Sequence, residues 1–96
     1  MKPIVIKLTV KANQKPGTID IVSQYGGVSH FTQLSNFGVN SKQDVQVQLN
    51  GSDDAIFWLP CNCTQVFNRG DVDITSLAFI GGKADTDVQA ILSIQE

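Results

Sequence analysis

The amino-acid sequence predicts an all-β protein: an antiparallel β-sandwich or small jelly roll of seven to eight strands. Apolar and polar residues alternate with a period of two in several segments of the 96-residue chain. Turn-forming residues separate those segments at roughly 8–12-residue intervals, as in β-sandwiches. One Glu and five Ala leave few strong helix formers. The length predicts a single domain spanning residues 1–96.

The N-terminal third of the chain predicts three strands. Residues 4–11 alternate regularly, which indicates a strand with one buried and one solvated face. Pro16-Gly17 marks a turn, and residues 18–23 alternate again and predict the second strand. After the Gly26-Gly27 pair, residues 28–34 predict a third, less regular strand.

The middle of the chain predicts a loop followed by a hairpin. Residues 35–43 are rich in Asn, Ser and Gly and predict a loop long enough for a Greek-key crossover. Residues 45–49 alternate cleanly, and the Asn50-Gly51 step suits a hairpin turn. The continuous apolar run 55–59 predicts a strand covered on both sides, which Pro60 ends.

The C-terminal third predicts one short strand and a terminal pair. Residues 64–67 form the short strand, and 68–71 have the composition of a turn. Residues 76–80 and 88–94 then predict two strands joined around Gly81-Gly82. No segment predicts a helix.

Charge is distributed unevenly along the chain. The first fifteen residues carry four lysines and no acid, whereas residues 16–96 carry three basic and nine acidic residues. We expect the basic strand bearing Lys7 and Lys11 to contact an acidic neighbour. The alternative is that its lysines only protect a sheet edge from aggregation. A pI of about 5.1 and a single Arg argue against a nucleic-acid partner.

The N-terminal sequence shows no secretory signal, and no apolar run approaches the roughly 18 residues of a membrane span. We therefore expect synthesis in a reducing cytoplasm and no membrane partner.

Catalytic and metal-binding residues are scarce. His30 is the only histidine, and its strand-like surroundings favour a hydrogen-bonded structural role over catalysis. Cys61 and Cys63 are too few for a zinc site and too close for an unstrained disulfide, so we expect two reduced, partly buried thiols. We expect no catalytic residue, metal site or cofactor.

Two pairs of aspartates leave a calcium site open as an alternative. Asp71 and Asp73 share one face of an extended segment, as do Asp85 and Asp87. Calcium takes six to eight oxygen ligands, so the site needs both pairs at one end of the sandwich. The Arg69-Gly70-Asp71 sequence is expected to be an ordinary glycine-centred turn.

Trp58 is the best indication of a partner surface. Phe57 and Trp58 are adjacent in a predicted strand and so point to opposite faces. One of them faces the core, and the other needs a second sheet or another subunit to cover it. In a carbohydrate-binding module, by contrast, Trp58 or Tyr25 would be an exposed platform for a sugar.

Residues 58–94 resemble the small β-sandwich proteins of bacteriophage particles, the decoration, vertex or minor capsid proteins. The shared pattern is an apolar strand ending in Leu59-Pro60, an aromatic residue at Phe67, the segment 72–80, a Gly-containing turn and the closing strand 88–94. The resemblance implies a structural role, symmetric homo-oligomers and contact with a capsid shell. It implies no catalytic residues.

From these observations we expect a non-enzymatic virion structural protein, made in the host cytoplasm. It is expected to act as a trimer or pentamer in contact with other capsid proteins, with Lys7, Lys11 and Trp58 at the partner interface. The alternative is a ligand-binding module such as a carbohydrate-binding domain.

Overall fold

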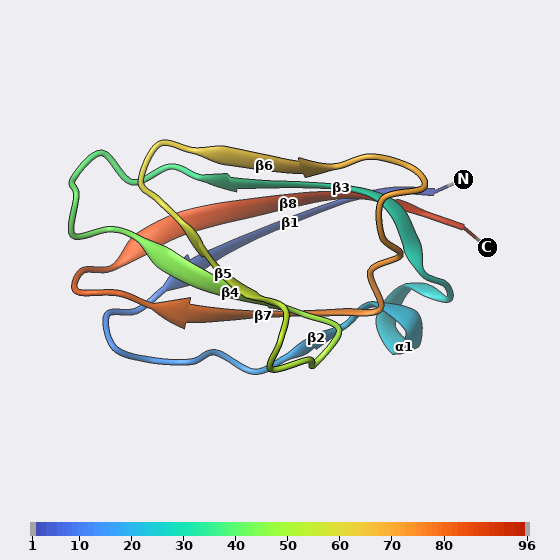
Figure 1. Ribbon diagram of the computed structural model, residues 1–96, viewed down its shortest axis with the longest axis horizontal. Coiled ribbons are helices and arrows are strands. Elements are labelled where there is room, and N and C mark those ends of the chain that lie inside the picture. Colours follow the sequence, from blue (N-terminus) through green and yellow to red (C-terminus); the bar gives the residue numbers. More distant parts are fainter. Residues whose placement is uncertain (1, 96) are drawn as a thin grey trace.

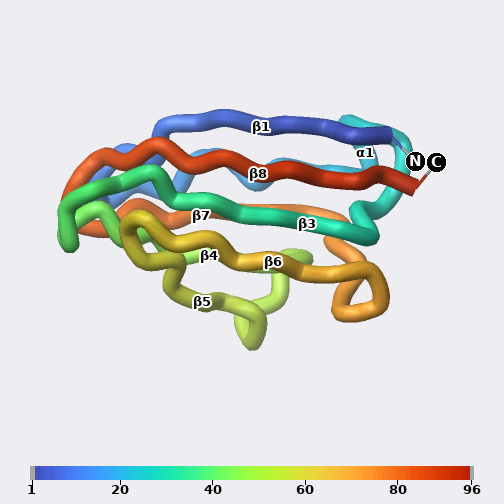
Figure 2. Tube along the Cα trace, turned by 90° about the horizontal axis from the view of Figure 1, so that it is seen from above, coloured from blue at the N-terminus to red at the C-terminus, as the bar shows by residue number. Residues whose placement is uncertain are grey.

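Two four-stranded antiparallel sheets stack face to face in the computed structural model, which describes residues 2–95 (Figure 1). In chain order the elements are β1 (Lys2–Val10), β2 (Ile19–Asp20), α1 (Ile21–Tyr25), β3 (Ser29–Asn36), β4 (Val45–Leu49), β5 (Ile56–Leu59), β6 (Thr64–Phe67), β7 (Ser76–Gly81) and β8 (Thr86–Ile94). One sheet has the order β1-β8-β3-β6 and the other β2-β7-β4-β5. Figure 2 looks onto the first sheet, with the second beneath it.

The strand order is that of a jelly roll. Strands pair as β1 with β8, β2 with β7, β3 with β6 and β4 with β5, so the chain forms one long antiparallel ribbon closed at β4 and β5. The ribbon is wound so that β8 also pairs with β3 and β7 with β4, which completes both sheets. The all-β prediction and its upper count of eight strands are confirmed.

The core lies between the sheets and is built from the alternating strands. In β8, Val88, Ala90, Leu92 and Ile94 are all buried, as their spacing predicts. Phe79 of β7 is the largest fully buried side chain. Burial of these apolar side chains contributes about 25 cal/mol per Å² and is the main favourable term in folding.

The prediction of a strand over residues 18–23 and of no helix is wrong. Only Ile19–Asp20 is a strand, and the chain then forms the single helical turn α1. The Asp20 carboxylate caps this turn by accepting the Ser23 N–H at 3.0 Å, and Gly26 ends it in the left-handed conformation, φ 83°. No helix among residues 2–95 is long and apolar enough to cross a membrane.

Two further strand predictions need correction. The third strand continues to Asn36, two residues past the predicted end, because Ser35 and Asn36 pair with β8. The apolar segment at β5 is not covered on both faces, because the sandwich has two layers and nothing among residues 2–95 packs over the outer face of this sheet. Ile56 and Trp58 are exposed on its outer face, whereas Leu59 is buried.

The ribbon winding brings four connections to one end of the sandwich (Figure 1). These are the β1–β2, β3–β4, β5–β6 and β7–β8 loops, at the end of the long axis opposite both termini. Residues far apart in sequence therefore meet there.

Candidate functional site

The outer surface of the sheet β1-β8-β3-β6, here called the β8 face, is poor in charge. Its strand registers place thirteen side chains outward, and only Lys7 and Asp87 among them are charged. The remainder are amides, hydroxyls and the apolar side chains Pro3, Val5, Phe31, Val66 and Ile91. Val5 is 55% exposed. Depletion of charge around apolar side chains is typical of the centre of a subunit interface.

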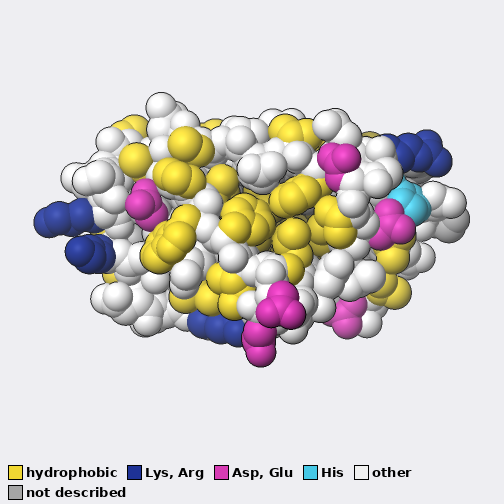
Figure 3. Space-filling view, in the orientation of Figure 1, with side chains coloured by type: hydrophobic (Ala, Val, Ile, Leu, Met, Phe, Trp, Pro, Cys, Tyr) yellow, Lys and Arg dark blue, Asp and Glu magenta, His cyan; other side chains and the backbone are white. Residues whose placement is uncertain are grey.

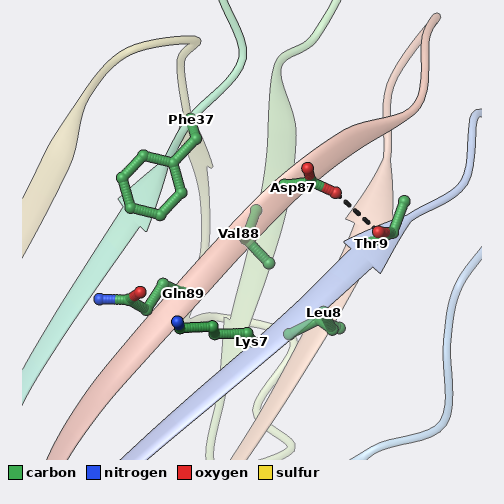
Figure 4. Close-up of a pocket in the computed structure, with 7 residues that line it drawn as sticks. All are labelled: Lys7, Leu8, Thr9, Phe37, Asp87, Val88 and Gln89. Carbon is green, nitrogen blue, oxygen red and sulfur yellow. Dashed lines mark hydrogen bonds between the residues drawn. The ribbon is translucent and has the colours of Figure 1, made fainter.

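An open depression of about 450 Å³ lies at one end of the β8 face (Figure 4). Lys7 and Gln89 are register partners on β1 and β8, and their side chains extend the same way beside it. The exposed ring of Phe37 forms its far wall. At its rim, Thr9 donates its hydroxyl hydrogen to Asp87 at 2.6 Å, so Asp87 is already engaged.

The structure places Lys7 and Lys11 in different surroundings. Lys7 has no acidic partner among residues 2–95, where the two ion pairs are Lys11–Asp85 and His30–Asp73. Lys11 Nζ lies 3.4 Å from Asp85 Oδ2, about 13 Å along the chain from Lys7. The pKa of Asp85 is held below its usual value of 3.8, chiefly because the carboxylate accepts the Ala12 N–H. The free cation of β1 on this face is therefore Lys7.

Trp58, the third predicted interface residue, is 57% exposed on the outer face of β5. It lines a second open depression, of about 340 Å³, together with Ser41, Lys42, Asp44 and Lys83. We call this site the Trp58 depression. Sequence reasoning missed Lys42 and Lys83, because nothing in their local sequence connects two residues that are 41 positions apart in the chain.

The loops around the Trp58 depression are joined by short contacts. The Lys42 carbonyl accepts the Ala84 N–H at 3.0 Å, and Asp44 Oδ1 accepts the Cys61 N–H at 2.9 Å. Gly82 packs so closely on Asp44 that an added Cβ would lie 2.3 Å from its carbonyl oxygen. The backbone that presents Lys42 and Lys83 is thus fixed relative to Trp58.

Asn36 anchors the same group of loops from inside the protein. Its buried side chain donates to the carbonyls of Gln43 (2.7 Å) and Leu59 (3.0 Å). Its amide oxygen accepts the Gly38 N–H at 2.8 Å and the Thr86 hydroxyl at 2.9 Å. One buried amide therefore connects the ends of β3, β5 and β8 to the β3–β4 loop.

A third apolar region lies along the open side of the sandwich, between the edge strands β5 and β6. Figure 3 shows hydrophobic side chains gathered across the middle of this side. Phe57 and Phe67 meet there edge to face, with ring centroids 5.9 Å apart, and both are half-buried. Phe57 packs against the core, so of the two adjacent aromatics it is Trp58 that needs a partner to cover it.

His30 has the hydrogen-bonded, partly buried position that its sequence context predicts. It is the extra residue of a bulge in β3, and its side chain is 18% exposed. Its Nδ1 lies 2.6 Å from Asp73 Oδ1 in the β6–β7 loop. The pair fastens that loop to the sheet.

Cys61 and Cys63 are both free thiols in the β5–β6 loop. They do not form an extended pair, because Asn62 between them has φ 55° and turns the chain. Cys61 is half-buried, as expected, whereas Cys63 is exposed.

The two aspartate pairs do not meet. Asp71 and Asp73 lie in the β6–β7 loop and Asp85 and Asp87 beside the β7–β8 loop, at opposite ends of the sandwich (Figure 1). No group of three or more His, Cys, Asp or Glu side chains within residues 2–95 is placed to hold a metal ion. The structure therefore does not support the alternative of a calcium site built from both pairs. The Arg69-Gly70-Asp71 segment forms the predicted turn, with φ 93° at Gly70.

The fold and these surfaces define an eight-stranded jelly-roll protein. No protein-family model and no curated protein sequence matches the chain. Among solved structures it is similar to the cupin domain of Cnp3 from Schizosaccharomyces pombe, with a TM-score of 0.59 and 8% sequence identity. The match covers 97% of this chain and 53% of that chain, so this chain spans about half the length of its structural neighbour. At this identity the similarity supports the jelly-roll fold alone.

Proposed function

We propose that this protein is a non-enzymatic structural subunit of a virion, a capsid decoration, vertex or minor capsid component that acts through contacts between its own copies. The observation that carries the proposal is the β8 face, which presents five apolar side chains and only two charged ones. Jelly rolls are a recurrent architecture of viral capsid domains, which agrees with this role. The proposed assembly is a trimer or pentamer that contacts other capsid proteins.

The size of the β8 face suits a subunit contact. The strands β1, β8, β3 and β6 have nine, nine, eight and four residues. At about 4.8 Å between strands and about 3.3 Å per residue they give a flat projection of roughly 480 Å². Side-chain relief and the adjoining Phe37 ring enlarge it toward the roughly 800 Å² that a stable interface buries on each partner. In a cyclic trimer or pentamer this face meets a different surface of the next copy, so Lys7 pairs with an acidic group there.

Val5→Asp tests this role, because it places a carboxylate among the apolar side chains of the β8 face, on the edge strand β1 opposite Ile91 of β8, without touching the core. We expect wild-type protein to elute as a trimer or pentamer in light scattering behind a sizing column, and the variant as a folded monomer. Val22→Asp is the matched control, because Val22 is 43% exposed on α1, away from this face. A wild-type monomer at every concentration, or an unchanged mass for Val5→Asp, would refute the proposed contact.

A ligand-binding module such as a carbohydrate-binding domain is the second candidate function. The specific observation in its favour is the exposure of Trp58, since an uncovered indole in a depression is a common platform for sugar rings. Jelly rolls also occur in lectin domains, so the fold is compatible with both candidates.

A further inference from the structure

We propose that the Trp58 depression binds an acidic saccharide, a sugar carrying carboxylate or sulfate groups, with its ring stacked on the indole and its charges on Lys42 and Lys83. The inference rests on the second candidate function and assigns it a ligand class. It is independent of the β8 face, because the depression is built on the other sheet and its loops.

The charges in the depression determine the sign of the charge that its ligand carries. Neither Lys42 nor Lys83 forms an ion pair within the part of the chain that the structure describes. The carboxylate of Asp44 is the opposing charge, and one of its oxygens is engaged by the Cys61 N–H. Two ammonium groups and one partly engaged carboxylate leave the depression with a net charge of +1, which favours an anion.

The aromatic side chain determines the shape of the ligand. The row across the outer face of β5, β4 and β7 is Trp58, Gln46 and Ile80, so the indole has an amide beside it and no charged register partner. A sugar ring offers the indole an apolar face of C–H groups. Its hydroxyls can bond to Ser41, which lines the depression, and to the amide of Gln46, the register partner of Trp58. An inorganic anion can pair with the two lysines, but it has no apolar face that would stack on the indole.

The site is preorganised, which reduces the entropic cost of binding. Lys42 and Lys83 lie on loops joined by the Lys42–Ala84 hydrogen bond and by Gln43, which donates its side-chain N–H to the Asp85 carbonyl at 2.9 Å. The depression lies on the sheet opposite the β8 face, so the β8 face of the same subunit does not cover it.

Intrinsic fluorescence tests the inference directly, because Trp58 is the only tryptophan in the chain. The probes are trigalacturonate, a heparin tetrasaccharide, maltotriose as the neutral sugar, inorganic phosphate and a short single-stranded oligonucleotide. We expect saturable changes in indole emission with one or both acidic sugars and none with the other three probes. The two acidic probes distinguish carboxylated from sulfated sugars.

The Lys42→Gln, Lys83→Gln double variant is expected to bind the acidic sugar about tenfold more weakly, the effect of two exposed charge pairs. Lys2→Gln, Arg69→Gln is the matched control, since it removes the same charge at the opposite end of the molecule and should bind as wild type. Equal binding of maltotriose, equal responses to phosphate or the oligonucleotide, or no response to either acidic sugar would overturn the inference. Solution mass measured on the same samples reports assembly separately, so a failure here is distinguishable from a failure of the β8-face contact.

Discussion

Replacing Asn36 with Ala should destabilise the protein far more than its single polar side chain suggests. The side chain is 2% exposed and makes four hydrogen bonds of 2.7 to 3.0 Å. Each such bond contributes about 0.5–1.5 kcal/mol net, so their loss sums to roughly 2–6 kcal/mol. The variant also leaves the two carbonyls, the N–H and the hydroxyl without their partner in a buried site. We expect a loss of about 3–5 kcal/mol.

That loss is a large share of the protein's total free energy of unfolding. Domains of this size have free energies of unfolding of about 5–15 kcal/mol, so the variant should unfold at a clearly lower urea concentration. Equilibrium urea unfolding followed by circular dichroism measures the change. Gln33→Ala is the control, because Gln33 lies on the outer face of the same strand and should change stability by less than about 0.5 kcal/mol.

A loss below about 1 kcal/mol for Asn36→Ala, similar to that of Gln33→Ala, would refute the reasoning. It would mean that water replaces the amide at no cost and that the loops are held by other contacts. A second readout separates the global from the local effect. A folded Asn36→Ala protein should show a shifted Trp58 emission even without denaturant, because the amide holds the last carbonyl of β5 at Leu59.

Three further predictions concern packing and pH. Gly82→Ala should cost about 1–3 kcal/mol in thermal or urea unfolding, because its Cβ would lie 2.3 Å from the backbone oxygen of Asp44. Asp85→Asn should be less stable than wild type above about pH 4, with the difference shrinking as the pH falls below 3.8; a constant difference from pH 7 to pH 2 would contradict this. The sign follows from the lowered pKa of the folded carboxyl, which the Ala12 N–H stabilises in its charged form, so this stabilisation is present at higher pH and is lost in acid. Phe67→Ala should cost about 2 kcal/mol, below the range for a fully buried Phe, because the ring is only half-buried against its partner on β5; no change in the urea midpoint would show that the open side of the sandwich is not packed.

The strands that alternate were predictable because alternation is a local property of the sequence. β1, β4 and β8 show this most clearly, and their buried faces are those predicted. The helix α1 was missed because Ile19 and Ile21 also fit a strand. Ile21 is the first residue of the helical turn, and its side chain is buried in the core, as it would be in a strand. Asp20 and Gly26, a capping residue and a left-handed stop, were the signal that could have revealed it.

The candidate sites depend on which strands pair and which loops meet, and no local sequence pattern predicts this. Trp58 was singled out because it adjoins Phe57, and it is exposed because its side chain lies on the outer face of a two-layer sandwich. Lys42 and Lys83 join it only because the ribbon brings the β3–β4 and β7–β8 loops to one end. Asn36 was assigned to a loop. Its role needs four partners spread over 50 residues of sequence, which only the folded topology brings together.

The β3–β4 loop connects the two proposed surfaces. Phe37, at its start, forms the wall of the depression on the β8 face, and Lys42 and Asp44, at its end, line the Trp58 depression. Asn36 holds both halves, since it bonds to the Gly38 N–H and to the Gln43 carbonyl. A subunit that packs on Phe37 therefore contacts the same eight-residue loop that positions Lys42. By linkage, any change in saccharide affinity on assembly must be matched by an equal change in assembly on saccharide binding. Because Asn36 fixes the loop in one conformation, this coupling should be small in the wild type and should grow in variants that loosen it.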